Sequence, residues 1–238
     1  MRRQKERGRK CLIVARLLEM KQRELTRLRD IEHIRDPFDP STFDDIVFPS
    51  EGAATYLKRW VARSTATRNI MLYGPPGTGK TRAAHLLARE RSVGFLDLHP
   101  VRYVECETGT FDSLLQIEKG ESLLFDRLAN PQFSPVTILD EVDTYEKRQQ
   151  KQLKKILERS DLTYVLLTNH IDKLDRAVRD RCYEIPWYMP SFERCKSRLA
   201  AISAQYLSKQ LGDDTLQERV YTTAGWRQCL RNLETLIN

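Results

Sequence analysis

The chain has 238 residues, of which 40% are hydrophobic and 31% are charged, and its formal net charge is +7. That length suits one α/β domain with a small appendage, and the hydrophobic share is large enough for a buried core. No apolar run approaches the roughly 18 residues that cross a bilayer, and the amino terminus lacks the apolar stretch of a secretory signal. We therefore expect a cytoplasmic protein, or one of the nucleoid or nucleus if the source is eukaryotic or viral. The five cysteines include no CxxC pair, so neither a zinc site nor a disulfide framework is expected.

The first predicted element is a basic amphipathic helix in an N-terminal arm, residues 1–36. Residues 1–35 hold 12 Lys/Arg against 5 Asp/Glu, a surplus equal to the net charge of the whole chain. Leucine and isoleucine recur at helical spacing, which predicts one modest apolar face. Such an arm suits nucleic-acid phosphates or an acidic partner, and it equally suits a solvated helix whose charges only keep it soluble. Pro37 and Pro40 then end the helix.

From residue 37 onward, strand-like and helix-like segments alternate, as in a parallel sheet covered on both faces. Strands are predicted at 69–73, 102–105, 136–139, 162–167 and 182–185. Helices are predicted at 80–91 and 148–159. After Pro190, Ser191 resembles an N-cap, and the remaining chain is helical in pattern. The predicted fold is an α/β core (37–188) with helices on both faces of a parallel sheet, followed by a small all-helical lid (189–238).

A glycine-rich loop, G-P-P-G-T-G-K-T, joins the first of these strands to a helix. It fits the pattern G-x-x-x-x-G-K-[ST], whose backbone N–H groups form a nest for phosphates at a helix N-terminus. Lys80 would reach the β- and γ-phosphates, and Thr81 would ligate Mg²⁺. Taken alone, the loop predicts only phosphate binding and also fits kinases, GTPases and transporters; with the motifs that follow, ATP and Mg²⁺ are the expected cofactors. The residues expected to bind nucleotide here are Gly74, Pro75, Pro76, Gly77, Thr78, Gly79, Lys80, Thr81 and Arg82.

Two acids follow the apolar strand at 136–139. Asp140 is predicted to hold Mg²⁺, directly or through water, and Glu141 to polarise the attacking water. Paired acids after a strand are commonly just an N-cap, and the glycine-rich loop is what favours the catalytic interpretation. The next strand ends in Thr168-Asn169, where the amide of Asn169 could orient the lytic water or contact the γ-phosphate. A lone asparagine is more often a turn former.

Together these motifs resemble the AAA+ ATPase superfamily, from about Pro40 to the end of the chain. I-L-D-E-V-D resembles its Walker B motif and L-L-T-N its sensor 1. The segment 174–182 resembles the one that delivers an arginine finger, and Gly225-Trp226-Arg227 resembles sensor 2. The resemblance implies that Arg227 closes over the nucleotide from the lid.

Within that superfamily the chain is most similar to clamp-loader ATPase subunits, without their C-terminal collar domain. P-S-T-F-D-D-I-V resembles their lead-in, which implies that Ile46 and Val47 help to enclose the adenine. Asp180-Arg181-Cys182 resembles their S-R-C motif, with Asp in place of Ser. This implies that Arg181 acts in trans on a neighbouring subunit. A structural salt bridge is the alternative for Arg181, and Arg179 is the rival candidate.

The helix at 148–159 resembles the Q-x-x-L-R-R-x-x-E helix of clamp loaders, which implies DNA contact coupled through Gln150 to the ATPase site. Helical spacing puts Lys147, Lys151, Lys154 and Lys155 on one face. They are the predicted DNA-binding residues, or else an ordinary solvated face opposite a stripe of Leu153, Ile156 and Leu157.

The predicted function is an AAA+ ATP hydrolase that works at subunit interfaces, DNA-dependent and clamp-loader-like, in DNA replication. The expected partners are other AAA+ subunits in a homo- or hetero-oligomeric ring, double-stranded or primer-template DNA, and a sliding clamp or helicase. A helicase loader or transposition regulator is the main alternative. A polypeptide-threading remodeller is less consistent with the sequence, because 105–112 lacks an aromatic-hydrophobic-glycine triplet. A non-hydrolysing scaffold conflicts with the presence of Lys80 and Glu141.

Overall fold

The computed structural model describes residues 40–92, 101–106, 111, 135–159, 162–207 and 210–236. These residues belong to one compact unit, Pro40–Asn238. The predicted basic helix of the N-terminal arm lies outside the described residues. None of the helices described is long and apolar enough to cross a bilayer.

Within the described residues, five parallel strands form the sheet in the order β2-β3-β4-β1-β5. Their bounds are β1 Ile70–Tyr73, β2 Val101–Glu105, β3 Val136–Asp140, β4 Thr163–Thr168 and β5 Tyr183–Pro186. All five strands were predicted, to within one residue at most ends. Because the strands are parallel, their carboxyl ends meet at one edge of the sheet.

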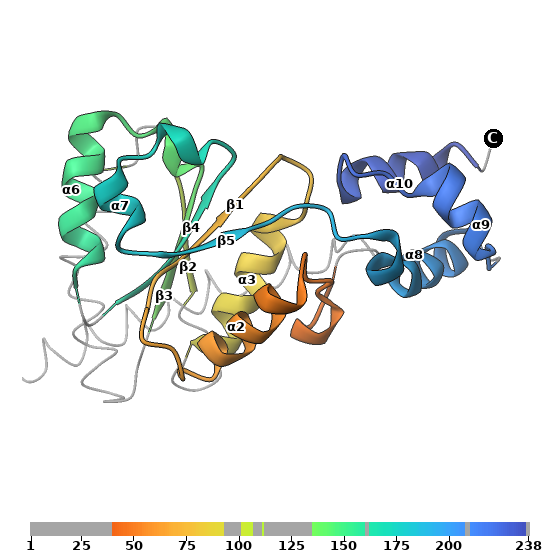
Figure 1. Ribbon diagram of the computed structural model, residues 1–238, viewed down its shortest axis with the longest axis horizontal. Coiled ribbons are helices and arrows are strands. Elements are labelled where there is room, and N and C mark those ends of the chain that lie inside the picture. Colours follow the sequence, from red (N-terminus) through yellow and green to blue (C-terminus); the bar gives the residue numbers. More distant parts are fainter. Residues whose placement is uncertain are drawn as a thin grey trace, which may run out of the picture. The chain divides into compact units, whose positions relative to one another are not determined.

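Helices cover both faces of this sheet (Figure 1). On one face lie α2 (Glu51–Val61) and α3 (Lys80–Arg91), and on the other lie α6 (Lys147–Leu157) and α7 (Arg176–Arg179). Alternate side chains of each strand supply the two cores. In β1, Ile70 and Leu72 pack with α2 and α3, whereas Met71 packs with α6.

Helix α2 (Glu51–Val61) is an element that the sequence pattern does not predict. Ser50 caps this helix by accepting a hydrogen bond from the Ala53 amide at 3.1 Å. Its buried residues follow the helical repeat, with Leu57 and Trp60 fully buried. The pattern was present in the sequence, but alanines at the first two buried positions weaken its apolar contrast.

Short helices make the turns that follow the strands and precede α2. They are η1 (Phe43–Asp45), η2 (Val142–Thr144) and η3 (Ile171–Lys173). The predicted lid comprises α8 (Phe192–Leu207), α9 (Asp213–Thr215), the π-helical η4 (Leu216–Val220) and α10 (Trp226–Glu234). The α/β P-loop fold with a helical C-terminal part is thus confirmed.

Candidate nucleotide site at the carboxyl edge of the sheet

The glycine-rich loop leaves the carboxyl end of β1 and enters α3. Gly77 and Gly79 have φ of +79° and +84°, which side-chain-bearing residues rarely adopt. Gly79 is the N-cap of α3, so the loop's amides gather at a helix N-terminus. This local geometry fits an anion such as a phosphate.

Lys80 is the first residue of α3, and its side chain turns back over the loop. Its Nζ donates to the Gly74 and Pro75 carbonyls at 2.7 and 2.8 Å and to Asn169 Oδ1 at 2.8 Å. Burial lowers the pKa of Lys80 to about 8, against the opposing effect of nearby acids. Lys80, at the start of α3, and Asn169, directly after β4, are both predicted site residues, and they contact each other directly.

The acids at the end of β3 lie beside the start of α3. The Thr81 hydroxyl donates to Asp140 Oδ2 at 2.9 Å, and the Glu141 amide donates to Asp140 Oδ1 at 2.9 Å. A hydroxyl and a carboxylate are the hard oxygen ligands that Mg²⁺ prefers, so this pair fits the ion. Glu141 has a φ of +56°, a conformation that costs a non-glycine residue energy and is found at functional turns.

Two residues at this edge were missed by the sequence analysis. Asp143 accepts a hydrogen bond of 2.6 Å from the Thr168 hydroxyl and so joins the turn after β3 to the end of β4. Tyr103 of β2 donates to Asp140 Oδ2 at 3.0 Å. Asp143 was visible as the last acid of I-L-D-E-V-D, but the position of Tyr103 follows from the pairing of β2 with β3.

Two segments outside the loop hold it in place. The Trp187 indole donates to the Thr78 carbonyl at 3.1 Å, and the Arg227 amide donates to the Gly77 carbonyl at 3.3 Å. A Cβ on Gly225 would lie 2.6 Å from the Gly77 oxygen, so only glycine permits this approach. The lid thus touches the phosphate loop through the start of α10, and the exposed Arg227 lies there.

The lead-in segment lies along α3. Arg82 donates through Nε to the Pro40 carbonyl at 2.8 Å, and Ile46 packs against the core shared by α2 and α3. Val47 is half-buried beside it. The role of Ile46 and Val47 at an adenine stays a prediction.

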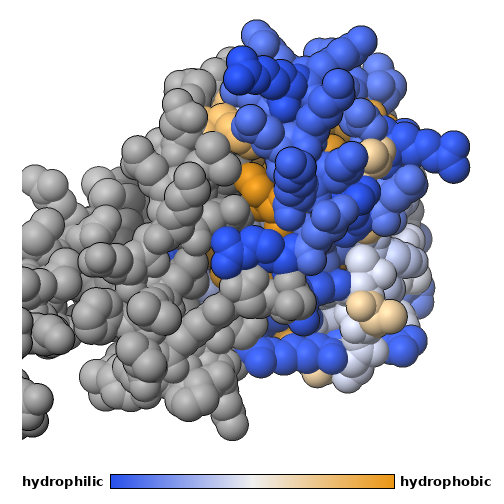
Figure 2. All heavy atoms as spheres, turned by 90° about the vertical axis from the view of Figure 1, so that its left-hand side faces the viewer, coloured by the Kyte–Doolittle hydropathy of each residue, from blue (hydrophilic) through white to orange (hydrophobic). Residues whose placement is uncertain are grey.

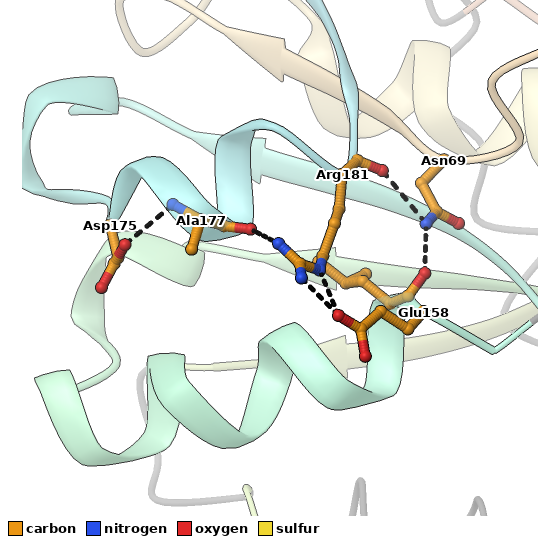
Figure 3. A network of polar contacts seen from close by, with 6 residues as sticks. Asn69, Glu158, Asp175, Ala177 and Arg181 are labelled. Atoms are coloured by element: carbon orange, nitrogen blue, oxygen red, sulfur yellow. Dashed lines mark hydrogen bonds and ion pairs between the residues drawn. The ribbon is translucent and has the colours of Figure 1, made fainter.

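Figure 3 shows the polar contacts of Arg181, which lies at the opposite end of β1 from its own phosphate loop. Its carbonyl accepts a hydrogen bond from Asn69, which precedes β1, whereas the loop follows β1. The four residues of β1 separate Asn69 from Gly74 by about 17 Å. The Arg181 guanidinium donates to Glu158 Oε1, with Nε at 3.0 Å, and to the Ala177 carbonyl.

The rival arginine is also paired within the chain. Arg179 donates to both carboxylate oxygens of Glu184, at 2.8 and 3.1 Å. Its side chain is 35% exposed, against 27% for Arg181. Neither arginine reaches the phosphate loop through any contact of the described residues.

Helix α6 has two distinct faces. Lys147, Lys151 and Lys155 are exposed and Lys154 is half-buried, whereas Leu153, Ile156 and Leu157 are in the core. Figure 2 shows the side of the molecule that carries α6, and hydrophilic residues predominate there. The basic stripe therefore faces outward.

Gln150 has a buried position on α6. It donates through Nε2 to the Tyr145 carbonyl at 2.8 Å and to the Lys173 carbonyl at 3.3 Å. Its Oε1 accepts from the Asp175 amide at 2.7 Å. The side chain thus joins the start of α6 to the segment between Asn169 and α7.

Comparison with known proteins agrees with this site. The family model for the ATPase family associated with various cellular activities (AAA) matches residues 70–187, about half of the chain. Replication factor C subunit 3 of Blastobotrys adeninivorans is 26% identical over 203 residues, which cover 80% of this chain and 55% of that protein. Replication factor C small subunit 2 of Pyrobaculum islandicum is 28% identical, with 80% and 58% covered. This chain thus spans little more than half the length of these relatives.

Solved structures share the fold. The Thermotoga maritima RuvB Holliday junction branch migration motor aligns with a TM-score of 0.60 and 18% identity, over 83% of this chain and 64% of that one. At that identity the likeness concerns the fold alone. Sheet order, phosphate loop, paired acids and family match agree, and the chain belongs to the AAA+ ATPase superfamily.

Proposed function

We propose that this chain is an ATP hydrolase that acts at subunit interfaces under the control of DNA, as a clamp-loader-like component of DNA replication. The observation that carries the proposal is the meeting of Lys80 with Asn169 and of Thr81 with Asp140 around one phosphate loop. These contacts join three strand ends at a single anion-binding turn. Relatives named Replication factor C subunits support the replication role.

Each residue of the site has a distinct task. The amides of the loop and Lys80 bind the phosphates, and Thr81 and Asp140 hold Mg²⁺. Bound Mg²⁺ neutralises charge on the phosphates. Glu141 accepts the proton of the attacking water, which Asn169 orients. Arg227 reaches the nucleotide from the lid, and Ile46, Val47 and Arg82 line the base and ribose side.

Arg181 completes the site of a neighbouring subunit. Its position at the far end of β1 supports action in trans, because it cannot serve its own loop without leaving the sheet edge. The side chains of the Arg181–Glu158 pair are 27% and 54% exposed, and ion pairs in contact with solvent contribute only about 0–1 kcal/mol. Arg181 could therefore exchange Glu158 for a neighbour's phosphates, which are also anionic. Arg179, which donates two hydrogen bonds to Glu184, is the rival candidate.

The basic stripe of α6 supports DNA binding. Exposed lysines at helical spacing can follow a phosphate backbone and release counterions. Gln150 gives this helix a direct hydrogen-bonded link to the segment that runs from Asn169 to α7. A DNA-induced shift of α6 would therefore reach both the catalytic edge and Arg181.

The remaining parts of the proposal concern organisation and location. We divide the chain into the arm 1–36, the core 37–188 and the lid 189–238. We place the protein in the cytoplasm, or in the nucleoid or nucleus, with other AAA+ subunits in a ring. A sliding clamp or a helicase is the proposed protein partner.

The test is the steady-state ATPase rate with no DNA, single-stranded DNA, duplex DNA and primer-template DNA, each with and without the cognate clamp. Clamp loading predicts the strongest stimulation with primer-template DNA plus clamp. Stimulation by duplex alone, with filament formation, would instead favour the transposition-regulator alternative. Identical rates under all conditions would contradict a DNA-controlled enzyme.

A further inference from the structure

Three hydrogen bonds from described residues reach the carboxylate of Asp140. Thr81 Oγ1 and the Tyr103 hydroxyl both donate to Oδ2, at 2.9 and 3.0 Å, and the Glu141 amide donates to Oδ1 at 2.9 Å. Thr81 and Glu141 are part of the phosphate-loop and Walker B motifs. Tyr103 belongs to neither, and it comes from a different strand.

The sheet register brings Tyr103 to this carboxylate. Tyr103 pairs with Ile138 and Glu105 pairs with Asp140 in the parallel ladder of β2 and β3. Residues two apart on a strand share a face, so Tyr103 and Asp140 are diagonal neighbours on the same side of the sheet. Such neighbours lie about 7–8 Å apart at Cα, within the reach of a tyrosine side chain.

A ring from α3 fixes the Tyr103 side chain. His85 stacks on Tyr103 with ring centroids 5.2 Å apart and an interplanar angle of 24°. His85 lies four residues after Thr81, so both project from one face of α3. One face of α3 thus supplies both the Thr81 hydroxyl, which contacts Asp140, and the His85 ring, which stacks on Tyr103.

We propose that Tyr103 is a positioning residue for the magnesium site, and this inference rests on the proposed ATPase function. Its hydroxyl holds the Asp140 carboxylate in the rotamer that keeps Oδ2 toward Thr81. The ion then meets a carboxylate that is already oriented, and less side-chain entropy is lost on binding. Tyr103 acts through Asp140 and does not touch the phosphates.

The test compares Tyr103→Phe with the wild type. Phenylalanine keeps the ring and the stack on His85 but removes the hydroxyl. The first measurement is the affinity for a fluorescent ADP analogue, in excess EDTA and in Mg²⁺. A lost hydrogen bond of about 0.5–1.5 kcal/mol corresponds to a roughly 2- to 12-fold change. We expect unchanged affinity in EDTA and a loss of that size in Mg²⁺.

The second measurement separates positioning from catalysis. In ATPase assays, Tyr103→Phe should raise the Mg²⁺ concentration for half-maximal rate by about the same factor, with kcat unchanged at saturating Mg²⁺. His85→Ala, which keeps the hydroxyl but removes its support, should give a smaller change in the same direction. Tyr183→Phe is the matched control, because Tyr183 is 43% exposed, as Tyr103 is at 44%, and lies on β5.

Three results from the variants would overturn the inference, and so would one result from the wild type. The first is an equal Mg²⁺ dependence of the ATPase rate in the wild type and Tyr103→Phe. The second is a loss of nucleotide affinity in Tyr103→Phe that is as large in EDTA as in Mg²⁺. The third is an effect of Tyr183→Phe as large as that of Tyr103→Phe. A wild type that binds nucleotide equally well with and without Mg²⁺ would overturn it too. Failure of the proposed function itself is distinguishable, because the wild type would then hydrolyse no ATP at any Mg²⁺ concentration.

Discussion

Asn69 is a buried polar residue at the end of the sheet opposite the nucleotide site. It is 5% exposed, and its amide donates to the Leu157 and Arg181 carbonyls at 3.0 and 3.3 Å. Its Oδ1 accepts from the Tyr164 amide at 3.1 Å. One side chain therefore ties the end of α6, the start of β4 and the turn before β5 together, and Figure 3 shows its bonds to the end of α6 and to Arg181.

Replacing Asn69 with alanine should lower the free energy of unfolding by about 2–4 kcal/mol, because buried backbone groups lose their partner. Urea denaturation followed by circular dichroism measures this. Thr67→Ala, in the loop before β1, is a nearby control with a smaller expected effect. A loss below about 0.5 kcal/mol for Asn69→Ala would mean that water or a rearranged loop replaces its hydrogen bonds.

Some residues of the site can be predicted from a short stretch of sequence, whereas others depend on how distant segments pair in the fold. Lys80, Thr81, Asp140 and Glu141 lie within short motifs whose spacing carries the chemistry, so the sequence predicted them, and the structure brings them together. Tyr103 depends on the β2–β3 register, which no local pattern encodes. Asn169 was predicted from its place after a strand, and the structure adds its bond to Lys80.

At the scale of elements, α6 combines a core face, a buried glutamine and a basic stripe. Changing Lys151, Lys154 and Lys155 to alanine should flatten the stimulation of ATPase by DNA. It should also reduce the slope of log affinity against log salt by up to about 3, near 0.9 for each phosphate that a lysine no longer neutralises. DNA titrations at several salt concentrations measure the slope.

A control variant that removes the same number of charges distinguishes an effect of the α6 lysines from an effect of the protein's net charge. Changing the exposed residues Lys58, Arg89 and Arg219 to alanine removes the same three charges elsewhere. The salt slope should then stay close to the wild-type value. Equal slopes for the two triple variants would show that the α6 stripe has no special part in DNA binding.

The contact between α10 and the phosphate loop depends on glycine. Gly225 has a φ of +122°, and an added Cβ would lie 2.6 Å from the Gly77 oxygen. Gly225→Ala should therefore destabilise this contact by about 1–3 kcal/mol and weaken nucleotide binding accordingly. Gly212→Ala is the control, because nothing lies within 4 Å of its Cβ position. Comparable nucleotide affinities for both variants would contradict a lid that closes on the loop.

The strands and the helices α3, α6 and α8 were predictable because each has a clear apolar period or a motif at its start. Helix α2 was missed, since its alanines look neutral, and its burial depends on packing against α3. Gln150 was predicted to couple DNA to the site on resemblance alone. Its buried bonds to Tyr145, Lys173 and Asp175 are a tertiary arrangement that helical spacing could not reveal.

At the scale of the whole molecule, the proposal requires assembly. If Arg181 acts in trans, Arg181→Ala subunits lack activity but keep an intact phosphate loop, and Lys80→Ala subunits lack nucleotide binding but keep Arg181. Mixing the two should restore part of the ATPase rate through mixed interfaces. Mass measurement with ATP and DNA should show an oligomer. A monomeric particle with full activity would exclude a site shared between subunits.

We propose that Asp140 and Glu141, beside the glycine-rich loop, carry out ATP hydrolysis. The most direct measurement is ATP affinity and turnover of the wild type and Glu141→Gln in Mg²⁺. We predict similar affinities and a turnover reduced by about 10²- to 10⁴-fold, the contribution of a general base. Equal turnover in the two proteins would contradict the account.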